Sequence, residues 1–277
     1  GSAVATTSAI GSFMLPEMKK AGYEPNFSAA VTAAASTTGM LIPPSNILIV
    51  YAIASGGVSI AALFMAGYIP GIMVGLALML VCFIYAKMKG YPLSPRLPIK
   101  VVVEKTIAAL PSLFLIFLVI GGIVGGVFTA TEAGAIAVVY SLLLAVVFYK
   151  EVDAKALPDI FLKAAETTAI VMLLIAASTA MSWLLSFENI PQTLSNALLS
   201  ISDNPLLILL LINLLLIVVG AFLDMTPAVL IFTPIFLPVA LELGMSELQF
   251  GIMLVLNLSI GLCSPPVGAV LFITCAI

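Results

Sequence analysis

Long runs of apolar residues dominate the chain, and short polar or Gly-Pro segments separate them. Several runs reach the roughly 20 residues that an α-helix needs to cross the hydrocarbon core of a bilayer. The runs are continuous, as in Leu206–Val219, and lack the short alternating pattern of a transmembrane β-strand. The pattern therefore predicts an all-α polytopic membrane protein.

The polar breaks divide the chain into spans and interrupted segments. Uninterrupted spans are predicted at Ile60–Lys87, Thr106–Ile120, Ala133–Tyr149 and Thr167–Phe187. A Gly-rich break is expected at 121–126 and a charged linker at 150–163. Val4–Met18 is too short to span alone. Because Pro interrupts the helical hydrogen-bond ladder, two longer segments are predicted to break: Phe27–Ser55 at Gly39 and Pro43-Pro44, and Leu248–Ile277 at Gly261 and Pro265-Pro266.

The basic residues agree with a topology that contains two re-entrant hairpins. In this topology Val4–Met18 is the returning half of one hairpin, and Leu206–Leu243 is a second hairpin that enters from the opposite face. All ten Lys and Arg residues then lie on one side, which the positive-inside rule makes cytoplasmic. The charges are few, so other topologies are also compatible with them.

The start of the chain overlays its end when the sequence is shifted by 222 residues. The matches are mainly Gly and Pro: Leu15-Pro16 with Leu237-Pro238, Gly22 with Gly244, Gly39 with Gly261, and Pro43-Pro44 with Pro265-Pro266. Gly and Pro control backbone conformation, so the repeat preserves helix breaks more than side-chain contacts. Because the two units enter from opposite faces, the pattern predicts an inverted repeat, which is common among secondary transporters.

The doubled prolines favour a binding function over a simple kink. In hydrocarbon every backbone N–H and C=O needs a partner, so such a break is tolerated where it lines a cavity or binds an ion. Half-helix N-termini attract anions, whereas freed carbonyls suit Na⁺. Hydroxyl groups stand beside both breaks and could be cation ligands or helix–helix contacts. The candidate Na⁺ residues are Thr37, Gly39, Ser259, Gly261 and Ser264.

Composition excludes several classes of site. Charged residues make up 8 % of the 277 residues and hydrophobic residues 62 %, against about 25 % charged in a soluble domain. The absence of histidine removes His-based metal sites and His general bases. The three cysteines, Cys82, Cys263 and Cys275, form no CxxC pair and are interpreted as packing residues. No basic cluster suggests nucleic acid, and no organic cofactor is expected.

Two acids stand apart from the charged loops. Asp224 precedes Met225-Thr226-Pro227 at the tip of the second hairpin, where it is either a helix N-cap or an intramembrane site residue. Glu132, next to Thr131 at a helix start, is predicted to have a capping role. The two acids lie about 90 residues apart on separate predicted elements, which argues against an intramembrane enzyme.

Many ordered motifs resemble the large membrane subunit of tripartite ATP-independent periplasmic (TRAP) transporters. The resemblance covers nearly the whole chain and differs from the usual Phe-Thr-Pro-Thr-Glu stretch at Ala130. The motifs are Gly1-Ser2-Ala3-Val4-Ala5, Ala9-Ile10-Gly11-Ser12, Leu15-Pro16-Glu17-Met18 to Gly22-Tyr23, Gly39 to Ser45, Leu63-Phe64-Met65-Ala66-Gly67 with Pro70-Gly71, Gly126 to Ala133, Ile190-Pro191, Thr233-Pro234 to Pro238, and Gly261 to Gly268 with Leu271-Phe272.

The resemblance implies an elevator-type transport domain in the bacterial inner membrane, a small membrane subunit and a periplasmic solute-binding protein as partners, and a missing N-terminal third. It places Gly1 and Ser2 on the first hairpin tip and Gly220, Asp224 and Thr226 near the second. The expected substrate-site residues are Gly1, Ser2, Thr38, Pro43, Pro44, Ser45, Asp224, Thr226, Pro265 and Pro266.

Together these features predict Na⁺-coupled import of a small organic acid, of the C4-dicarboxylate or sugar-acid class, with Na⁺ as coupling ion. Residues 1–56 and 205–277 are the two transport repeats, and 57–204 are connecting scaffold helices. The alternative is a Na⁺/carboxylate symporter that works without a binding protein, and the remote alternative is an intramembrane enzyme.

Overall fold

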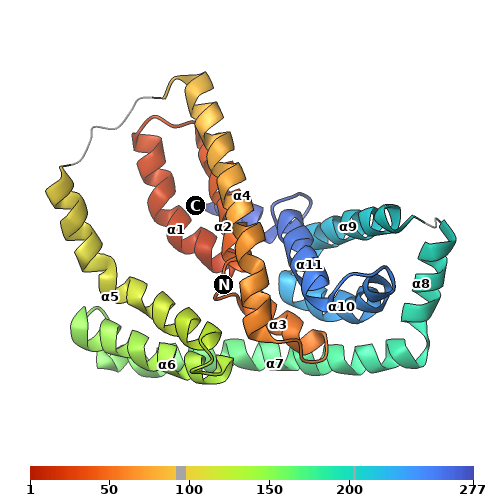
Figure 1. The fold of residues 1–277 in the computed structure, drawn as a ribbon. Helices are drawn as coiled ribbons and strands as arrows, with labels where there is room; N and C mark the ends of the chain where they lie inside the picture. The colour runs from red at the N-terminus through yellow and green to blue at the C-terminus, as the bar shows by residue number, and fades with distance from the viewer. Residues whose placement is uncertain (92–97, 202–203) are drawn as a thin grey trace. The chain divides into compact units, whose positions relative to one another are not determined.

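The computed structural model describes residues 1–91, 98–201 and 204–277, and every regular element in these ranges is a helix (Figure 1). The all-α prediction is therefore confirmed. The elements are α1 (Ala3–Lys20), α2 (Pro25–Leu41), α3 (Asn46–Ala54), α4 (Ile60–Lys89), α5 (Ile99–Val124), α6 (Ala130–Leu142), the π-helix η1 (Leu143–Phe148), the short 3₁₀ turn η2 (Ala154–Ala156), α7 (Leu157–Phe187), α8 (Ile190–Ile201), α9 (Pro205–Phe222), α10 (Met225–Glu242), α11 (Glu247–Leu262) and α12 (Ala269–Ala276).

Six helices of the described chain are long and apolar enough to cross a membrane: α4, α5, α6 continued by η1, α7, α9 and α10. The pair α2 and α3 forms a seventh candidate span that bends by 50° at its break. These helices expose large apolar side chains such as Phe83 and Phe117, which suits contact with lipid. The prediction of a polytopic membrane protein is confirmed.

The helix boundaries follow the 222-residue repeat. Shifting α1 by 222 residues gives 225–242, which are the bounds of α10, and shifting α2 gives 247–263, one residue beyond α11. Gly22 and Gly244 follow α1 and α10 with the same left-handed φ of 84°. A side chain is strained at such a φ, so glycine at both positions lets the chain turn into the next helix. The two sequence repeats therefore form helices with nearly the same bounds.

The chain divides into two compact units. The first contains Gly1–Pro92 and Leu173–Ile277, and the second contains Leu93–Met172. In the first unit, α9 and α11 pack with almost no side chain between them. A Cβ on Gly261 would lie 2.5 Å from the backbone of Gly220, and one on Gly220 would lie 2.6 Å from the Leu258 carbonyl oxygen. Small residues allow such close helix approach in membrane proteins.

Polar contacts hold the same helix pair together. The side-chain amide of Asn257 on α11 donates to the side-chain oxygen of Asn213 on α9, and also to the Met253 carbonyl at 2.8 Å. Asn213 in turn donates to the Leu209 carbonyl at 2.6 Å. Amide groups that bond across two helices stabilise their association in an apolar medium.

One tyrosine joins the two repeats within the first unit. Tyr51 on α3 is fully buried, and its hydroxyl donates to the Glu247 carbonyl at the start of α11 at 2.6 Å. Its ring lies against Gly251, where an added Cβ would come within 2.3 Å of the ring. The ring therefore fills a space that only glycine leaves open on α11.

A cluster of polar and aromatic side chains ties the α1–α2 turn to the end of α4. The Glu24 carboxylate accepts from the Tyr85 hydroxyl at 2.6 Å and pairs with Lys89 at 3.2 Å, while the Glu24 N–H donates to the Tyr91 hydroxyl at 3.1 Å. The hydrogen bond from Tyr85, and then the charge of Lys89, lower the pKa of Glu24. We call Glu24, Tyr85, Lys89 and Tyr91 the Glu24 cluster.

The second unit contains α5, α6, η1, η2 and the first part of α7. The Tyr140 hydroxyl of α6 donates to the Pro111 carbonyl of α5 at 2.8 Å, and Phe114 and Tyr140 stack at a tilt. At the start of α6, Thr129 and Glu132 form a reciprocal capping box. The predicted capping role of Glu132 is therefore confirmed.

Several predicted boundaries are wrong. Helix α2 continues through Gly39 and α11 through Gly261, so the breaks lie only at the Pro-Pro pairs. Gly261 instead permits the close approach to α9. Helix α5 likewise continues through Gly121 to Val124, and α7 begins inside the predicted linker, at Leu157. Glycine tolerates helical conformation, so tertiary contacts decide whether a helix ends there.

Candidate functional site

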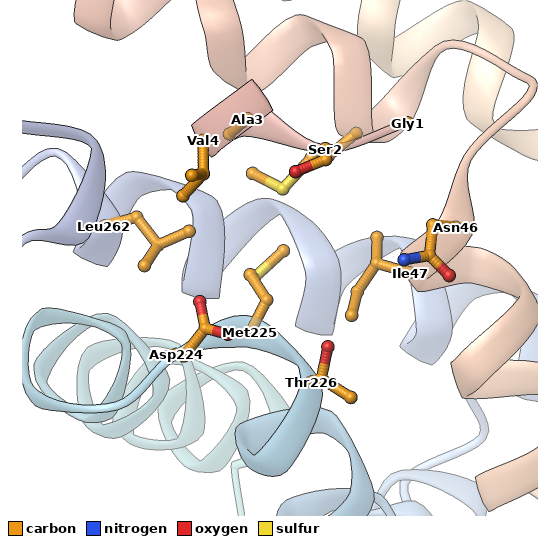
Figure 2. Close-up of a pocket in the computed structure, with 11 residues that line it drawn as sticks. Gly1, Ser2, Ala3, Val4, Asn46, Ile47, Asp224, Met225, Thr226 and Leu262 are labelled. Carbon is orange, nitrogen blue, oxygen red and sulfur yellow. The ribbon is translucent and has the colours of Figure 1, made fainter. Parts of the chain in front are cut away.

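Three helices of the first unit begin at one cavity of about 230 Å³ (Figure 2). They are α1, α3 and α10, and residues near the ends of α2 and α11 complete the wall. The lining residues are Gly1, Ser2, Ala3, Val4, Met40, Asn46, Ile47, Asp224, Met225, Thr226 and Leu262. The cavity thus contains contributions from both repeats.

The helix starts make this cavity suitable for an anion. The Ser2 hydroxyl caps α1 by accepting from the Ala5 N–H at 3.3 Å, and the Ser45 hydroxyl caps α3 by accepting from the Leu48 N–H at 3.4 Å. Other N–H groups of each first turn have no partner within their helix. Together with the helix dipoles they favour negative charge at three N-termini.

Asp224 occupies the N-cap position of α10, but its side chain makes no capping hydrogen bond. It lines the cavity instead, as does Thr226 in the first turn of the same helix. Figure 2 shows Asp224 and Thr226 on the α10 side of the cavity and Ser2 on the α1 side. Ser2 and Asp224 are related by the 222-residue shift, so equivalent positions of the two repeats bring a hydroxyl and a carboxylate to one cavity.

The first break is held by Ser45. This residue is fully buried, and its hydroxyl donates to the Met40 carbonyl at 2.5 Å while capping α3. The bond connects the end of α2 directly to the start of α3. One turn earlier, Thr37 and Thr38 donate to carbonyls three residues back, each at 2.7 Å. A hydroxyl that donates its hydrogen to the backbone still has lone pairs to offer a cation.

The second break contains similar hydroxyl groups. Ser259 donates to the Leu256 carbonyl at 2.7 Å, and Ser264 donates to the Ile260 carbonyl at 3.1 Å. In the described part of the chain no group of three or more His, Cys, Asp and Glu residues could hold a metal ion. A cation at either break would therefore be bound mainly by hydroxyl and carbonyl oxygens, which are hard ligands that suit Na⁺.

The structure brings only part of the predicted substrate site to the cavity wall. Gly1, Ser2, Asp224 and Thr226 line the cavity. The others lie at or beside the breaks: Thr38, Pro43, Pro44, Ser45, Pro265 and Pro266. Gly1 connects the two groups, because a Cβ there would lie 3.0 Å from the Pro44 carbonyl oxygen. The residues just before α1 therefore lie against the break.

The candidate cation residues lie in two separate places, one at each break. Thr37 and Gly39 lie in the last turns of α2, whereas Ser259 and Gly261 lie in the last turns of α11 and Ser264 follows it. Thr37 corresponds to Ser259 and Gly39 to Gly261 under the 222-residue shift, whereas Ser264 falls on Ile42. The repeat therefore places two similar oxygen-rich helix ends in one unit. They are two candidate sites rather than one.

Sequence reasoning missed several wall residues. Asn46 is the first residue of α3 and presents an amide at the cavity, and Met40, Ile47 and Leu262 supply apolar wall. Asn46 follows Pro43-Pro44-Ser45 directly, so the sequence could have placed it at the start of a half-helix and hence among the candidate site residues. The apolar residues carried no such signal, because the sequence around them is uniformly apolar.

Comparison with known proteins identifies the family. Over residues 1–277 the chain matches the family described as "Tripartite ATP-independent periplasmic transporter, DctM component". The chain belongs to this family. It is a multi-pass protein of the bacterial inner membrane in a family of transport permeases, which are not enzymes. The earlier resemblance, and the expectation that the protein is not an enzyme, are confirmed.

The chain is similar to several proteins along all or nearly all of its length. The chain is 52 % identical over 277 residues to the uncharacterized protein YgiK of Salmonella typhimurium and covers 63 % of that protein. It is 38 % identical over 277 residues to the C4-dicarboxylate TRAP transporter large permease protein DctM of Pseudomonas aeruginosa, covering 65 % of it. It is also 38 % identical over 273 residues, 99 % of this chain, to the sialic acid TRAP transporter large permease protein SiaM of Vibrio cholerae, of which 64 % is covered.

Proposed function

We propose that the chain forms the substrate path of a transporter that imports a small organic acid together with Na⁺. The observation that carries the proposal is the cavity at which three helix N-termini meet. Its lining contains Asp224 but no Lys or Arg among the described residues. A carboxylate there would be held by backbone N–H groups and by neutral side chains such as Ser2, Asn46 and Thr226.

The charges of this cavity support cation coupling. An anionic substrate and the Asp224 carboxylate would repel one another in a site without a basic side chain. Cations bound with the substrate would offset this repulsion. The oxygen-rich ends of α2 and α11 are the proposed Na⁺ sites, with Thr37, Gly39, Ser259, Gly261 and Ser264 as their candidate residues. Substrate and Na⁺ would then bind cooperatively.

Relatives support the class of substrate and the partners. Proteins that align along all or nearly all of the chain are described as permeases for C4-dicarboxylates, 2,3-diketo-L-gulonate and sialic acid, all organic acids. By family membership we propose a small membrane subunit and a periplasmic solute-binding protein as partners. We further propose that α1 and the α9–α10 pair belong to opposed re-entrant hairpins and that transport follows an elevator movement.

Reconstitution tests this function. The protein and its small partner subunit are placed in proteoliposomes, and uptake of a labelled carboxylate is followed with and without an inward Na⁺ gradient and the binding protein. Uptake that requires both supports the proposal. Uptake that needs Na⁺ alone would make the protein a symporter that works without a binding protein, and uptake indifferent to Na⁺ would refute cation coupling.

A further inference from the structure

The loop after α11 is bound to the tip of the second hairpin. The Val267 and Gly268 N–H groups both donate to the Ala221 carbonyl, at 3.1 and 3.2 Å. Ala221 is the second-last residue of α9, so its carbonyl has no partner within that helix. We call these two hydrogen bonds the Ala221 tether.

The backbone around the tether leaves little freedom. Gly268 has a left-handed φ of 43°, and a Cβ there would lie 2.5 Å from the Ser264 carbonyl oxygen. On the α11 side, Gly261 contacts the backbone of Gly220, the residue before Ala221. The end of α9 is therefore in backbone contact with both sides of the second break, and a shift of one displaces the other.

The first break is fixed differently. Position 45 corresponds to position 267 under the repeat, and Ser45 bonds to Met40 and caps α3 from within its own segment. Valine has no hydroxyl, so Val267 cannot form the side-chain hydrogen bonds that Ser45 forms at the first break. Its loop amides bond instead to the hairpin, whose tip carries Asp224 and Thr226 only three and five residues beyond Ala221.

We infer that the Ala221 tether couples cation binding at the second break to the position of the hairpin tip that faces the cavity. The inference rests on the proposed function and assigns positioning roles to Ala221, Val267 and Gly268. A cation held by the end of α11 fixes the loop, the loop fixes α9 through the tether, and α9 sets the place of Asp224 and Thr226. By linkage, substrate at the tip raises cation affinity to the same extent.

Replacing the Val267 amide by an ester tests the tether. The ester, introduced as the α-hydroxy analogue of valine, removes one donor and keeps the side chain. Loss of one hydrogen bond should raise the half-saturating Na⁺ concentration for uptake about fivefold, with the maximal rate at saturating Na⁺ within about twofold of wild type. An ester at Leu63, whose N–H donates to the Ser59 carbonyl at the start of α4 at 3.0 Å, is the matched control.

The outcomes separate the inference from the proposed function. Wild-type uptake that does not depend on Na⁺ refutes the proposed function. Sodium-dependent uptake in which the Val267 ester leaves the half-saturating Na⁺ concentration unchanged, or changes it no more than the Leu63 ester, overturns the tether alone. A purely structural role would lower the maximal rate and the thermal midpoint together, without a selective change in Na⁺ dependence.

A second measurement does not depend on transport. Cys263 stands between α11 and the tethered loop and is partly exposed. With Cys82→Ser and Cys275→Ser in place, Na⁺ should slow its alkylation by a maleimide at least threefold relative to choline. Val267→Pro, which removes the same N–H donor, should abolish that protection by Na⁺. Equal protection in both proteins would overturn the inference.

Discussion

Single residues decide how closely the helices of the first unit approach. Gly261, Gly251 and Gly220 each lie where a Cβ would meet backbone or a ring within 2.6 Å. The sequence identified Gly261 as part of a break, whereas its observed role is close packing inside α11. The two roles look alike in sequence, because only the neighbouring helix distinguishes them.

Gly261→Ala is expected to destabilise the protein by about 1–3 kcal/mol, because its methyl group would press into the backbone of Gly220. Thermal unfolding in detergent measures this change. Gly75→Ala in α4 is the control, since a Cβ there meets nothing within 4 Å and alanine favours the helix. Equal midpoints for the two variants would show that the contact with α9 is not tight.

Tyr51→Phe removes the hydroxyl that bonds to the Glu247 carbonyl and keeps the ring against Gly251. We expect a loss of about 1 kcal/mol in the free energy of unfolding, because the Glu247 carbonyl loses the donor that the buried tyrosine supplies. Tyr68→Phe in α4 serves as the control, since no hydrogen bond to the Tyr68 hydroxyl is found among the described residues. A Tyr51→Phe protein as stable as Tyr68→Phe would contradict the role of this bond.

At the scale of elements, the repeat was the most informative part of the sequence. The shift of 222 residues predicts the bounds of α10 from α1 and those of α11 from α2 within one residue. Pro and Gly mark helix ends locally, so these boundaries were readable. The π-helix η1 and the short helix α8 were not predicted, because nothing in a uniformly apolar or mixed stretch distinguishes them.

The Glu24 cluster fastens the α1–α2 turn to the end of α4, and its strength should depend on pH. The folded pKa of Glu24 lies below its ordinary value of 4.5, so its stabilising effect is present above that value and is lost as the pH falls through the folded pKa. The thermal midpoint of the wild type should fall between pH 6 and pH 3 more than that of Glu24→Gln. Parallel curves would show that the exposed cluster adds nothing.

At the scale of the molecule, the fold class, the family and the repeated architecture were predictable, but the cavity was not. Its wall comes from five helices, and the sequence named four of its members: Gly1, Ser2, Asp224 and Thr226. Asn46 and the apolar wall residues required the fold, since they meet only when the two repeats pack together. The predicted domains, with boundaries after residues 56 and 204, stay a prediction.

In the proposed function, the cavity at the three helix N-termini holds the substrate carboxylate. A transport assay measures Na⁺-driven uptake by Asn46→Asp, at the break, beside Asn26→Asp, a matched change at the start of the same broken span. The carboxylate that Asn46→Asp adds to the cavity, beside that of Asp224, should repel the substrate and raise its half-saturating concentration at least about tenfold. Uptake by Asn26→Asp should resemble that of the wild type. Unchanged substrate affinity in a folded Asn46→Asp protein would show that the carboxylate does not bind in this cavity.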